Sequence, residues 1–258
     1  MSDRHLLLDT SDGVRTLTID RPERKNALTP AMYTALVDEL RAAEADDAVR
    51  VIVVTGTGDS FTSGNDLADF MNTPPAGEDS PVFQLLLTLL ALHKPLVAAV
   101  NGIAIGIGVT MLLQCDLVYA ADSAKLQLPF VGLGLVPEGG SSYVLPRLMG
   151  HARAAELLML GEKFSADEAA KAGLVTRVYP ASELMSAVRE KAQALAAKPT
   201  VSVRLTKELL RGPQRAALRD ALEREGALFL ERLTSAAAME AFTAFFEKRR
   251  PDFRQVGE

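Results

Sequence analysis

The spacing of apolar positions predicts regular structure from the start of the chain. Residues 6–8 and the alternating positions of residues 14–18 flank the turn signal Ser11-Asp12-Gly13, and this arrangement predicts an N-terminal β-hairpin. Apolar residues then recur at helical spacing from Thr29-Pro30 to Ala45. Threonine caps helices well and proline suits the first helical position, so we expect the helix to begin there.

Further along, strands alternate with helices. Three short apolar runs bounded by Gly, Asn or Asp are typical of strands buried on both faces, namely Val51–Thr55, Pro95–Val100 and Leu117–Ala120. Ser165-Ala-Asp-Glu168 resembles a capping box, Gly173 a helix stop, and Leu174–Val178 one more strand. This alternation predicts an α/β core of crossover units rather than a β-sandwich.

The pattern changes after Lys198-Pro199. From there it is almost entirely helical, and Gly212-Pro213 is predicted to separate two helices while Ser235 precedes a third. We therefore divide the chain into an α/β core over residues 1–198 and a helical region over residues 199–258. The apolar faces of these helices leave open whether they close over the core or pack against another copy of the chain.

Composition places the chain among ordinary globular proteins. With 48% apolar and 24% charged residues it does not belong to the disordered class. No apolar run reaches the ~20 residues of a membrane helix, and a net charge of −5 gives no general attraction to nucleic acid, so neither partner is expected. The N-terminus lacks an apolar signal region and the single cysteine, Cys115, has no disulfide partner, which favours a cytoplasmic location.

Several site chemistries are not expected. Three histidines and one cysteine form no cluster at metal-ligand spacing, so no metal site is predicted. Gly56-Thr-Gly58 and Gly106-Ile-Gly108 both lack the third glycine of a dinucleotide fingerprint. A phosphate-binding loop is missing, and Gly139-Gly-Ser-Ser-Tyr143 lacks the closing glycine of a nucleophile elbow.

Three glycine-containing segments are candidates for a functional site. Phe61-Thr-Ser-Gly-Asn-Asp-Leu67 follows a buried strand, and Asn101–Thr110 passes through glycines into an apolar helix. Free amides at such turns and helix starts attract negative charge. The alternative interpretations are a plain connection for the first segment and close packing of a helix on the sheet for the second.

The third segment, Pro129–Tyr143, carries an isolated carboxyl. Glu138 is the only carboxylate between Asp122 and Glu156, and its neighbours are apolar, glycine or hydroxyl residues. Loss of hydration disfavours the charged form and raises the pKa toward neutrality, where a carboxyl transfers protons well. The alternative is a glutamate that stabilises the dipole of a helix over residues 139–148.

In this order the motifs resemble those of the crotonase superfamily, also called the enoyl-CoA hydratase/isomerase family, over essentially the whole chain. Residues 20–28 resemble its N-terminal CoA-side segment, 61–67 and 99–108 its two oxyanion-hole segments, and 245–253 its C-terminal ending. The resemblance implies an α/β fold, a crotonase-like spiral of ββα units with a C-terminal helical trimerisation region. It also implies a homotrimer or a dimer of trimers.

The resemblance further implies that an acyl-CoA thioester binds with its thioester oxygen held by the backbone amides of Asn65 and Ile107. The other implied CoA contacts are the backbone of Ser63, Gly64, Asn65, Asp66 and Leu67 at the adenine, Lys25 and Ala27 along the CoA path, and Lys248 and Arg249 at a CoA phosphate. The last two belong either to the same subunit or to a neighbouring one, and a solvated helix end is their alternative role.

Two departures separate the chain from the hydratases of this family. Thr110 and Phe130 occupy the positions of the two hydratase glutamates, and neither transfers protons. By contrast, residues 63–67 and 136–143 resemble the peroxisomal type of Δ3,Δ2-enoyl-CoA isomerase, whose catalytic glutamate matches Glu138. One carboxylate moves the proton and an oxyanion hole stabilises the dienolate, so no cofactor beyond the substrate's own coenzyme A is expected.

Two alternatives remain open. One is a hydratase, or another crotonase-type enzyme, that uses Asp69 or Glu78. The other, of a different class, is a catalytically inactive CoA-binding scaffold. In each case we expect the acyl pocket to be lined by residues 70–75, residues 83–90 and the last helices.

Overall fold

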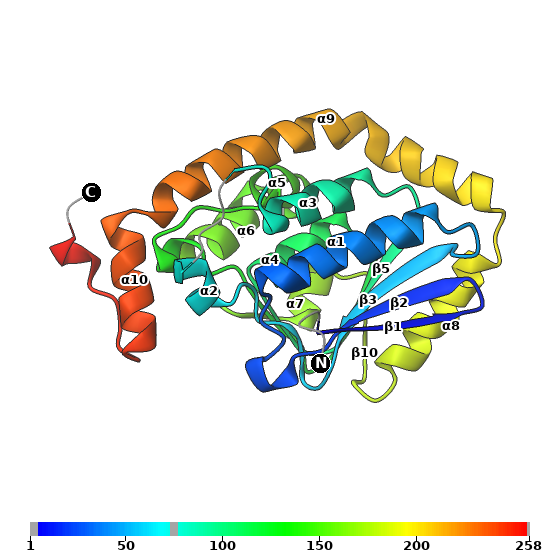
Figure 1. Ribbon diagram of the computed structural model, residues 1–258, viewed down its shortest axis with the longest axis horizontal. Coiled ribbons are helices and arrows are strands. Elements are labelled where there is room, and N and C mark those ends of the chain that lie inside the picture. The colour runs from blue at the N-terminus through cyan, green and yellow to red at the C-terminus, as the bar shows by residue number, and fades with distance from the viewer. Residues whose placement is uncertain (1–4, 73–76, 257–258) are drawn as a thin grey trace.

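The computed structural model describes residues 5–72 and 77–256, and it shows β-strands enclosed by helices (Figure 1). The strands are β1 (Leu6–Ser11), β2 (Val14–Ile19), β3 (Val51–Gly56), β4 (Ser60–Thr62), β5 (Leu96–Val100), β6 (Ile103–Ile105), β7 (Leu117–Ala121), β8 (Lys125–Gln127), β9 (Phe164–Ser165) and β10 (Arg177–Tyr179). The helices are α1 (Pro30–Ala45), α2 (Leu67–Asn72), α3 (Pro81–Ala91), α4 (Ile107–Thr110), α5 (Ser141–Met149), α6 (His151–Ala155), α7 (Ala166–Lys171), α8 (Leu184–Ala196), α9 (Thr200–Leu233) and α10 (Ala236–Phe246).

The strands form two sheets that the chain visits in turn. The larger sheet has the order β1-β2-β3-β5-β7-β10 and the smaller one β4-β6-β8-β9. β3, β5 and β7 pair in parallel in the larger sheet, and the strand that follows each of them, β4, β6 or β8, pairs in parallel in the smaller sheet. Helices return the chain between these pairs, so the predicted α/β spiral of ββα units is confirmed.

The early elements form where the apolar pattern places them. β1 and β2 pair as an antiparallel hairpin that closes at Ser11 and Val14. The Thr29 hydroxyl accepts a hydrogen bond from the Met32 amide, and α1 begins at Pro30. The capping box of α7 is also present, because the Ser165 side chain accepts from the Glu168 amide and Glu168 accepts from the Ser165 amide. Local capping chemistry therefore determines where these helices begin.

Two predicted boundaries are wrong, and backbone hydrogen bonds explain why. The amides of Leu174 and Val175 both donate to the Ala169 carbonyl, so they close the end of α7 and the strand begins only at Arg177. The helix predicted from residue 139 begins at Ser141, because Gly139 and Gly140 have φ values of +71° and +78° and form a left-handed turn.

The helix break predicted at Gly212-Pro213 is also wrong, because α9 runs unbroken through Pro213. Proline removes one backbone donor, and the carbonyl four residues earlier, at Leu209, loses its partner. Leu209 and Pro213 are both exposed, so that carbonyl is not left unpaired in the buried core. The cost of the proline is therefore small enough for contacts on either side to hold the helix together.

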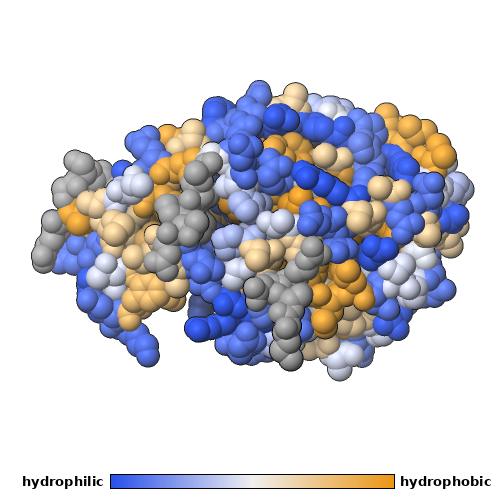
Figure 2. Space-filling model, in the orientation of Figure 1, coloured by the Kyte–Doolittle hydropathy of each residue, from blue (hydrophilic) through white to orange (hydrophobic). Residues whose placement is uncertain are grey.

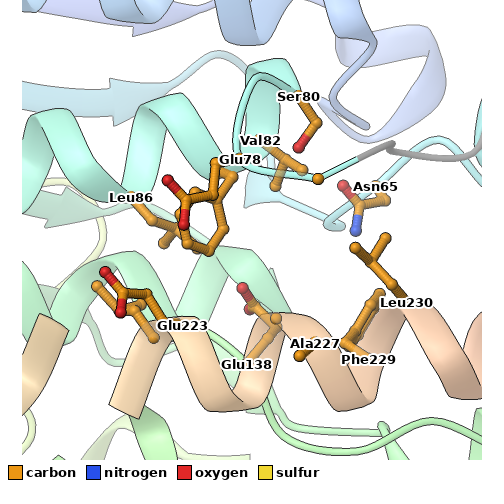
Figure 3. Close-up of a pocket in the computed structure, with 15 residues that line it drawn as sticks. Asn65, Glu78, Ser80, Val82, Leu86, Glu138, Glu223, Ala227, Phe229 and Leu230 are labelled. Carbon is orange, nitrogen blue, oxygen red and sulfur yellow. The ribbon is translucent and has the colours of Figure 1, made fainter. Parts of the chain in front are cut away.

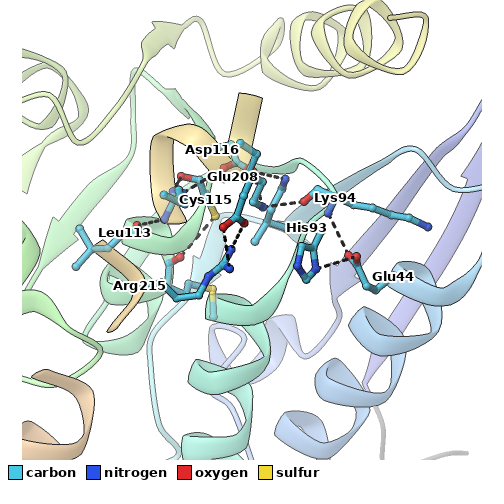
Figure 4. Close-up of polar contacts among 12 residues, drawn as sticks. Glu44, His93, Lys94, Leu113, Cys115, Asp116, Glu208 and Arg215 are labelled. Atoms are coloured by element: carbon cyan, nitrogen blue, oxygen red, sulfur yellow. Dashed lines mark hydrogen bonds and ion pairs between the residues drawn. The ribbon is translucent and has the colours of Figure 1, made fainter. Parts of the chain in front are cut away.

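A buried ion pair ties the first half of α9 to the core (Figure 4). The Lys207 ammonium, only 7% exposed, donates to Asp116 Oδ2 at 2.8 Å and to the Lys94 carbonyl at 2.7 Å. Arg211 adds a 3.2 Å contact to the same carboxylate and hydrogen bonds to the Leu113 and Cys115 carbonyls. The helical region after residue 199 thus contacts the α/β core directly, and the division at that residue stays a prediction.

Asp116→Asn is expected to lower the free energy of unfolding by about 3 kcal/mol, because it leaves the buried Lys207 charge without its counter-charge. Urea denaturation followed by circular dichroism measures this change. Glu190→Gln, which removes the solvent-exposed pair with Lys191, is the control and is expected to leave the midpoint nearly unchanged. Equal midpoints for the two variants would contradict the anchoring role of Asp116.

α9 spans the top of the molecule in Figure 1 and carries the chain to α10. α8 packs on the larger sheet through β3, β5 and β7, whereas α1 packs against β1, β2 and α3. Within residues 5–72 and 77–256, no helix combines the length and the apolar character required to cross a membrane. The ends of β4 and β6 face α9 and α10, and the candidate site lies between them.

Candidate active site

The segment before α1 holds residues 63–66, the turn predicted to form the first half of the oxyanion hole, in place. The Leu28 amide donates to the Gly64 carbonyl at 2.8 Å and the Leu28 carbonyl accepts from the Asp66 amide at 3.0 Å. The guanidinium of Arg21 adds a 2.7 Å ion pair to Asp66, and both side chains are largely buried. Residues 20–28 therefore brace residues 63–66 through main-chain and charged contacts.

This bracing fixes the direction of the Asn65 amide. Leu28 and Asn65 form a parallel bridge in which Leu28 bonds to the residues on either side of Asn65. In such a bridge the N–H and C=O of the opposite residue point away from the partner strand. Among the described residues, no acceptor takes the Asn65 N–H, and Asn65 lines the cavities that open on that side.

The second amide predicted for the oxyanion hole lies at the start of α4. Ile107 is the first residue of that helix, so its N–H has no partner in the preceding turn. Gly106 turns the chain into the helix with φ +56° and accepts from the Val109 and Thr110 amides through its carbonyl. Both predicted donors, Asn65 and Ile107, line one cavity of about 540 Å³.

A second cavity, of about 220 Å³, adjoins the first and contains Glu138 (Figure 3). Asn65 and Phe229 line both cavities, so the two spaces meet at the first oxyanion turn. The second cavity is mostly apolar, with Val82, Phe83, Leu86, Leu222 and Leu230 in its wall. Residues from the predicted range 83–90 and from α9 thus line this cavity, as expected. Of the other predicted stretch, 70–75, residues 73–75 lie outside the described residues.

Glu138 is a buried carboxyl that faces this cavity. Its side chain is 9% exposed, and the Thr110 hydroxyl donates to Oε1 at 2.5 Å. Burial raises the pKa of Glu138 to about 7; the Thr110 hydrogen bond opposes the rise and the negative charge of Glu225 adds to it. The carboxyl can therefore both accept and return a proton near neutral pH.

The raised pKa makes stability depend on pH. Between 4.5 and about 7 the folded state holds the Glu138 proton more tightly than the unfolded state, so the free energy of unfolding falls as pH rises through this window. Glu138→Gln removes the effect and is expected to be more stable than the wild type by about 3 kcal/mol at pH 8. Near pH 4 the urea midpoints of the two proteins are expected to converge; a constant difference across pH would contradict the burial of an ionisable Glu138.

Tyr33 was not identified from the sequence, yet it contacts the first oxyanion turn. Its hydroxyl donates to Asn65 Oδ1 at 2.5 Å, and its side chain is only 3% exposed. Burial, with the negative charge of Glu138 adding, raises the pKa of Tyr33 well above its ordinary value. Tyr33 therefore stays protonated and holds the Asn65 side chain. Its signal in the sequence is that of an ordinary apolar position of α1.

The predicted CoA-side residues separate into two groups. Ala27, Ser63, Gly64, Asn65, Asp66 and Leu67 all line the larger cavity. The three predicted cations Lys25, Lys248 and Arg249 line neither cavity within this chain. Lys25 is paired with Asp59 at 2.6 Å, and Lys248 lies exposed beyond α10. Arg249 is paired with Glu240 at 2.5 Å and with Glu247 at 2.6 Å. Arg24, which the sequence reasoning missed, is the cation that lines the larger cavity among the described residues.

Candidate metal ligands are sparse. In the part of the chain that the structure describes, no group of three or more His, Cys, Asp or Glu side chains converges as a metal ion would require. Asp69 lines neither cavity, while Glu78 is an exposed residue at the edge of the smaller one.

The joined cavities bring together free amides from two turns and a buried carboxyl. This is the geometry of an enzyme site that stabilises an oxyanion and moves a proton. Residues 9–256 match the family described as Enoyl-CoA hydratase/isomerase, and the chain belongs to that family. The family assignment made from the motifs is thus confirmed.

Known relatives carry both hydratase and isomerase names. Enoyl-CoA delta isomerase 2 of Homo sapiens is 40% identical over 220 residues, which cover 83% of this chain and 56% of the relative. The 2,3-dehydroadipyl-CoA hydratase of Escherichia coli (strain K12) is 35% identical over 252 residues, covering 96% and 98%. The chain also spans 64% of the length of the matching isomerase of Rattus norvegicus, so two of these relatives are considerably longer proteins.

A solved structure agrees over the whole fold. The enoyl-CoA hydratase/isomerase from Pseudoalteromonas atlantica T6c superposes with a TM-score of 0.92 at 43% identity, covering 96% of this chain and 99% of that one. Similarity at this level establishes the fold and the family, and the mixed names leave the particular reaction to the residues of the site.

Proposed function

We propose that the protein is a Δ3,Δ2-enoyl-CoA isomerase that shifts a 3-enoyl-CoA double bond to the 2 position. The observation that carries this proposal is Glu138, a buried carboxyl with a pKa of about 7 in a cavity that meets the Asn65 amide. Thr110 and Phe130 stand at the positions where the family's hydratases have two glutamates, which leaves Glu138 to transfer the proton. An isomerase-named relative at 40% identity supports the same choice.

In the proposed reaction Glu138 begins as a carboxylate and removes a proton from the α carbon. The electrons of that C–H bond form a dienolate whose negative charge rests on the thioester oxygen, where the Asn65 and Ile107 amides donate hydrogen bonds. Glu138, now a carboxylic acid, returns the proton to the γ carbon and the double bond forms between the α and β carbons. Each amide donor in such a hole contributes about 2.7–4 kcal/mol of transition-state stabilisation.

The two cavities fit the two ends of an acyl-CoA. The apolar walls of the smaller one suit an uncharged acyl chain beyond the reacting carbons. The larger one runs from the amides past Ala27 to Arg24, whose guanidinium is suited to the phosphates of CoA. We infer that no metal or redox cofactor takes part, because the one carboxyl and two amides supply every proton and charge contact the reaction uses.

The test is direct. The purified protein is incubated with a 3-enoyl-CoA, and the conjugated 2-enoyl-CoA product is followed by absorbance and chromatography. Conversion to the 2-enoyl-CoA without formation of a 3-hydroxyacyl-CoA supports the proposal. Tight acyl-CoA binding with no turnover of a panel of unsaturated thioesters would instead identify a CoA-binding scaffold.

Hydration is the second candidate, because Glu78 lines the same cavity as Glu138. Two carboxyls around one cavity are what the addition of water requires, one to activate the water and one to protonate the α carbon. Glu78 is exposed, however, and no shared contact ties it to Glu138 among the described residues. Hydration of crotonyl-CoA that is lost in Glu78→Gln would favour this alternative.

Exposed apolar side chains support the proposal of a homotrimer or dimer of trimers. Val201, Leu205, Leu209 and Leu210 are all exposed on the first half of α9, where Figure 2 shows hydrophobic groups gathered over that helix. Met239, Phe245 and Phe246 are similarly exposed on α10. Contiguous apolar groups of this kind mark contacts between proteins. Light scattering after size-exclusion chromatography measures the assembly, and a monomer at micromolar concentration would contradict it.

A further inference from the structure

A second buried carboxylate, Glu225 on α9, holds the turn that follows Glu138. The Gly140 amide donates to Glu225 Oε2 at 2.6 Å, the Ser142 amide donates to Oε1 at 2.8 Å, and the Ser142 hydroxyl donates to the same Oε1. The turn itself consists of glycines in the left-handed conformation, which have little rigidity of their own. The turn directly after Glu138 is therefore held by a contact between residues 85 positions apart in the chain.

The N-terminus of α5 has no local cap. α5 begins at Ser141 after Gly140, and its N-cap residue has no side chain to accept the first amides. A serine or aspartate, the usual caps, does not fit at that position, because Gly140 has φ +78° and an added Cβ would lie 2.3 Å from Leu218 Cδ1. Glu225, only 6% exposed, caps the helix from α9 at a cost in hydration. Its charge also lies close enough to act on Glu138.

The charged groups around Glu138 are acidic. Glu78 from the segment before α3 and Glu223 from α9 line its cavity, and the negative charge of Glu225 on α9 adds to the rise in the Glu138 pKa. Tyr33 of α1 is neutral, because the negative charge of Glu138 adds to the burial that keeps its hydroxyl protonated. Among the described residues, no Lys, Arg or His lines this cavity. Burial raises the pKa of Glu225 too, while its three hydrogen bonds and Arg224 oppose the rise. Three donors on the carboxylate favour the charged form of Glu225.

We propose that Glu225 is a positioning residue for Glu138, one that clamps the glycine turn and keeps a fixed negative charge beside the proton shuttle. The inference rests on the proposed isomerase function. A shuttle has to take a proton from one carbon and release it to another, so it works best when its protonated and ionised forms are close in free energy at the working pH. Glu225 provides both the geometry and the charge that this balance requires.

The test compares Glu225→Gln, which removes the charge at nearly the same size, with Glu225→Asp, which keeps the charge but shortens the reach. Glu231→Gln, an exposed carboxyl on the same helix, is the matched control. The protonation of Glu138 is followed directly by infrared difference titration against Glu138→Gln, without substrate. The pH profiles of kcat and kcat/KM are then measured with a 3-enoyl-CoA.

In Glu225→Gln we expect the Glu138 titration and the acid limb of kcat/KM to move together to lower pH by about half a pH unit or more. In Glu225→Asp the midpoint stays near the wild-type value while kcat falls roughly tenfold, because the turn is no longer held at the same place. Glu231→Gln is expected to keep the wild-type Glu138 titration midpoint and the wild-type kcat. A change in KM alone, with unchanged pH profiles of kcat and kcat/KM, is not expected from a residue that acts through Glu138.

Unmoved titration of Glu138 in folded Glu225→Gln overturns the proposal, and so does a wild-type kcat in folded Glu225→Asp. If circular dichroism shows that Glu225→Gln does not fold, the Asp variant alone decides through kcat. The infrared measurement needs no turnover, so the coupling is still tested if the wild type fails to isomerise 3-enoyl-CoA. Failure of the proposed function is thereby distinguished from failure of this inference.

Discussion

Glu138→Gln is expected to lower kcat for the conversion of 3-enoyl-CoA to 2-enoyl-CoA by roughly 10²–10⁴-fold, the contribution typical of a positioned general acid–base. Glutamine keeps the size of the side chain and accepts the Thr110 hydrogen bond through its carbonyl oxygen, but it cannot carry the proton between the α and γ carbons. Binding of a saturated acyl-CoA is expected to stay within a few-fold of the wild type, since the oxyanion amides remain in place. Stopped assays of turnover and calorimetric binding measure the two quantities.

The exposed Glu231→Gln serves as the control for the loss of a carboxyl on the nearby helix and is expected to keep the wild-type kcat. Because burial of the ionised Glu138 is unfavourable, the inactive variant is also the more stable protein at neutral pH. A Glu138→Gln protein with wild-type turnover would remove Glu138 from the reaction. A variant that loses both turnover and acyl-CoA binding would point to a misplaced turn rather than to a lost proton carrier.

Glu138 could be predicted as a candidate from the sequence because its isolation is a local property. A single carboxyl in a run of apolar, glycine and hydroxyl residues predicts desolvation, and the structure gives it a raised pKa of about 7. The two candidate oxyanion turns were predicted through family motifs, and the structure adds the physical reason why their amides are free. Asn65 stands opposite Leu28 in a parallel bridge, and Ile107 opens a helix.

The residues that hold the two parts of the candidate site have no comparable signal. Tyr33 and Glu225 sit on helices whose pattern is that of ordinary amphipathic segments, and their contacts with Asn65 and with the Gly140–Ser142 turn span 32 and 83–85 residues. Only the packing of α1 and α9 against the spiral brings these side chains to the site. A single sequence predicts local geometry well, but it does not encode such pairings in any short pattern.

The continuity of α9 illustrates the same limit. Gly212-Pro213 is a breaker signal by local chemistry, yet contacts on both sides override it. Lys207 and Arg211 fix the helix before the proline by their bonds to Asp116, and Glu225 fixes it after the proline by its bonds to Gly140 and Ser142. The Glu225 contacts lie at the candidate site. The unbroken α9 therefore connects the ion pair at Asp116 to the turn that follows Glu138.

Gly64→Ala is expected to lower kcat by roughly 10²-fold, because the two oxyanion turns approach each other at this residue. Gly64 has φ +90°, and a Cβ added there would lie 2.8 Å from the Ile105 carbonyl oxygen, two residues before Ile107. The close contact is with backbone rather than with the end of a flexible side chain, so one of the two turns has to move. The move displaces either the Asn65 amide or the Ile107 amide from the thioester oxygen.

The same substitution is expected to destabilise the fold by about 2–4 kcal/mol, from the left-handed backbone conformation and the overpacking together. Gly132→Ala is its matched control, because an added Cβ meets nothing within 4 Å and the backbone there is ordinary. At a temperature where both variants are fully folded, the Gly64→Ala protein should retain the Glu138 titration but bind a thioester-enolate analogue more weakly than the Gly132→Ala protein. Equal binding of that analogue by the two variants would mean that the spacing of the turns does not set the oxyanion contacts.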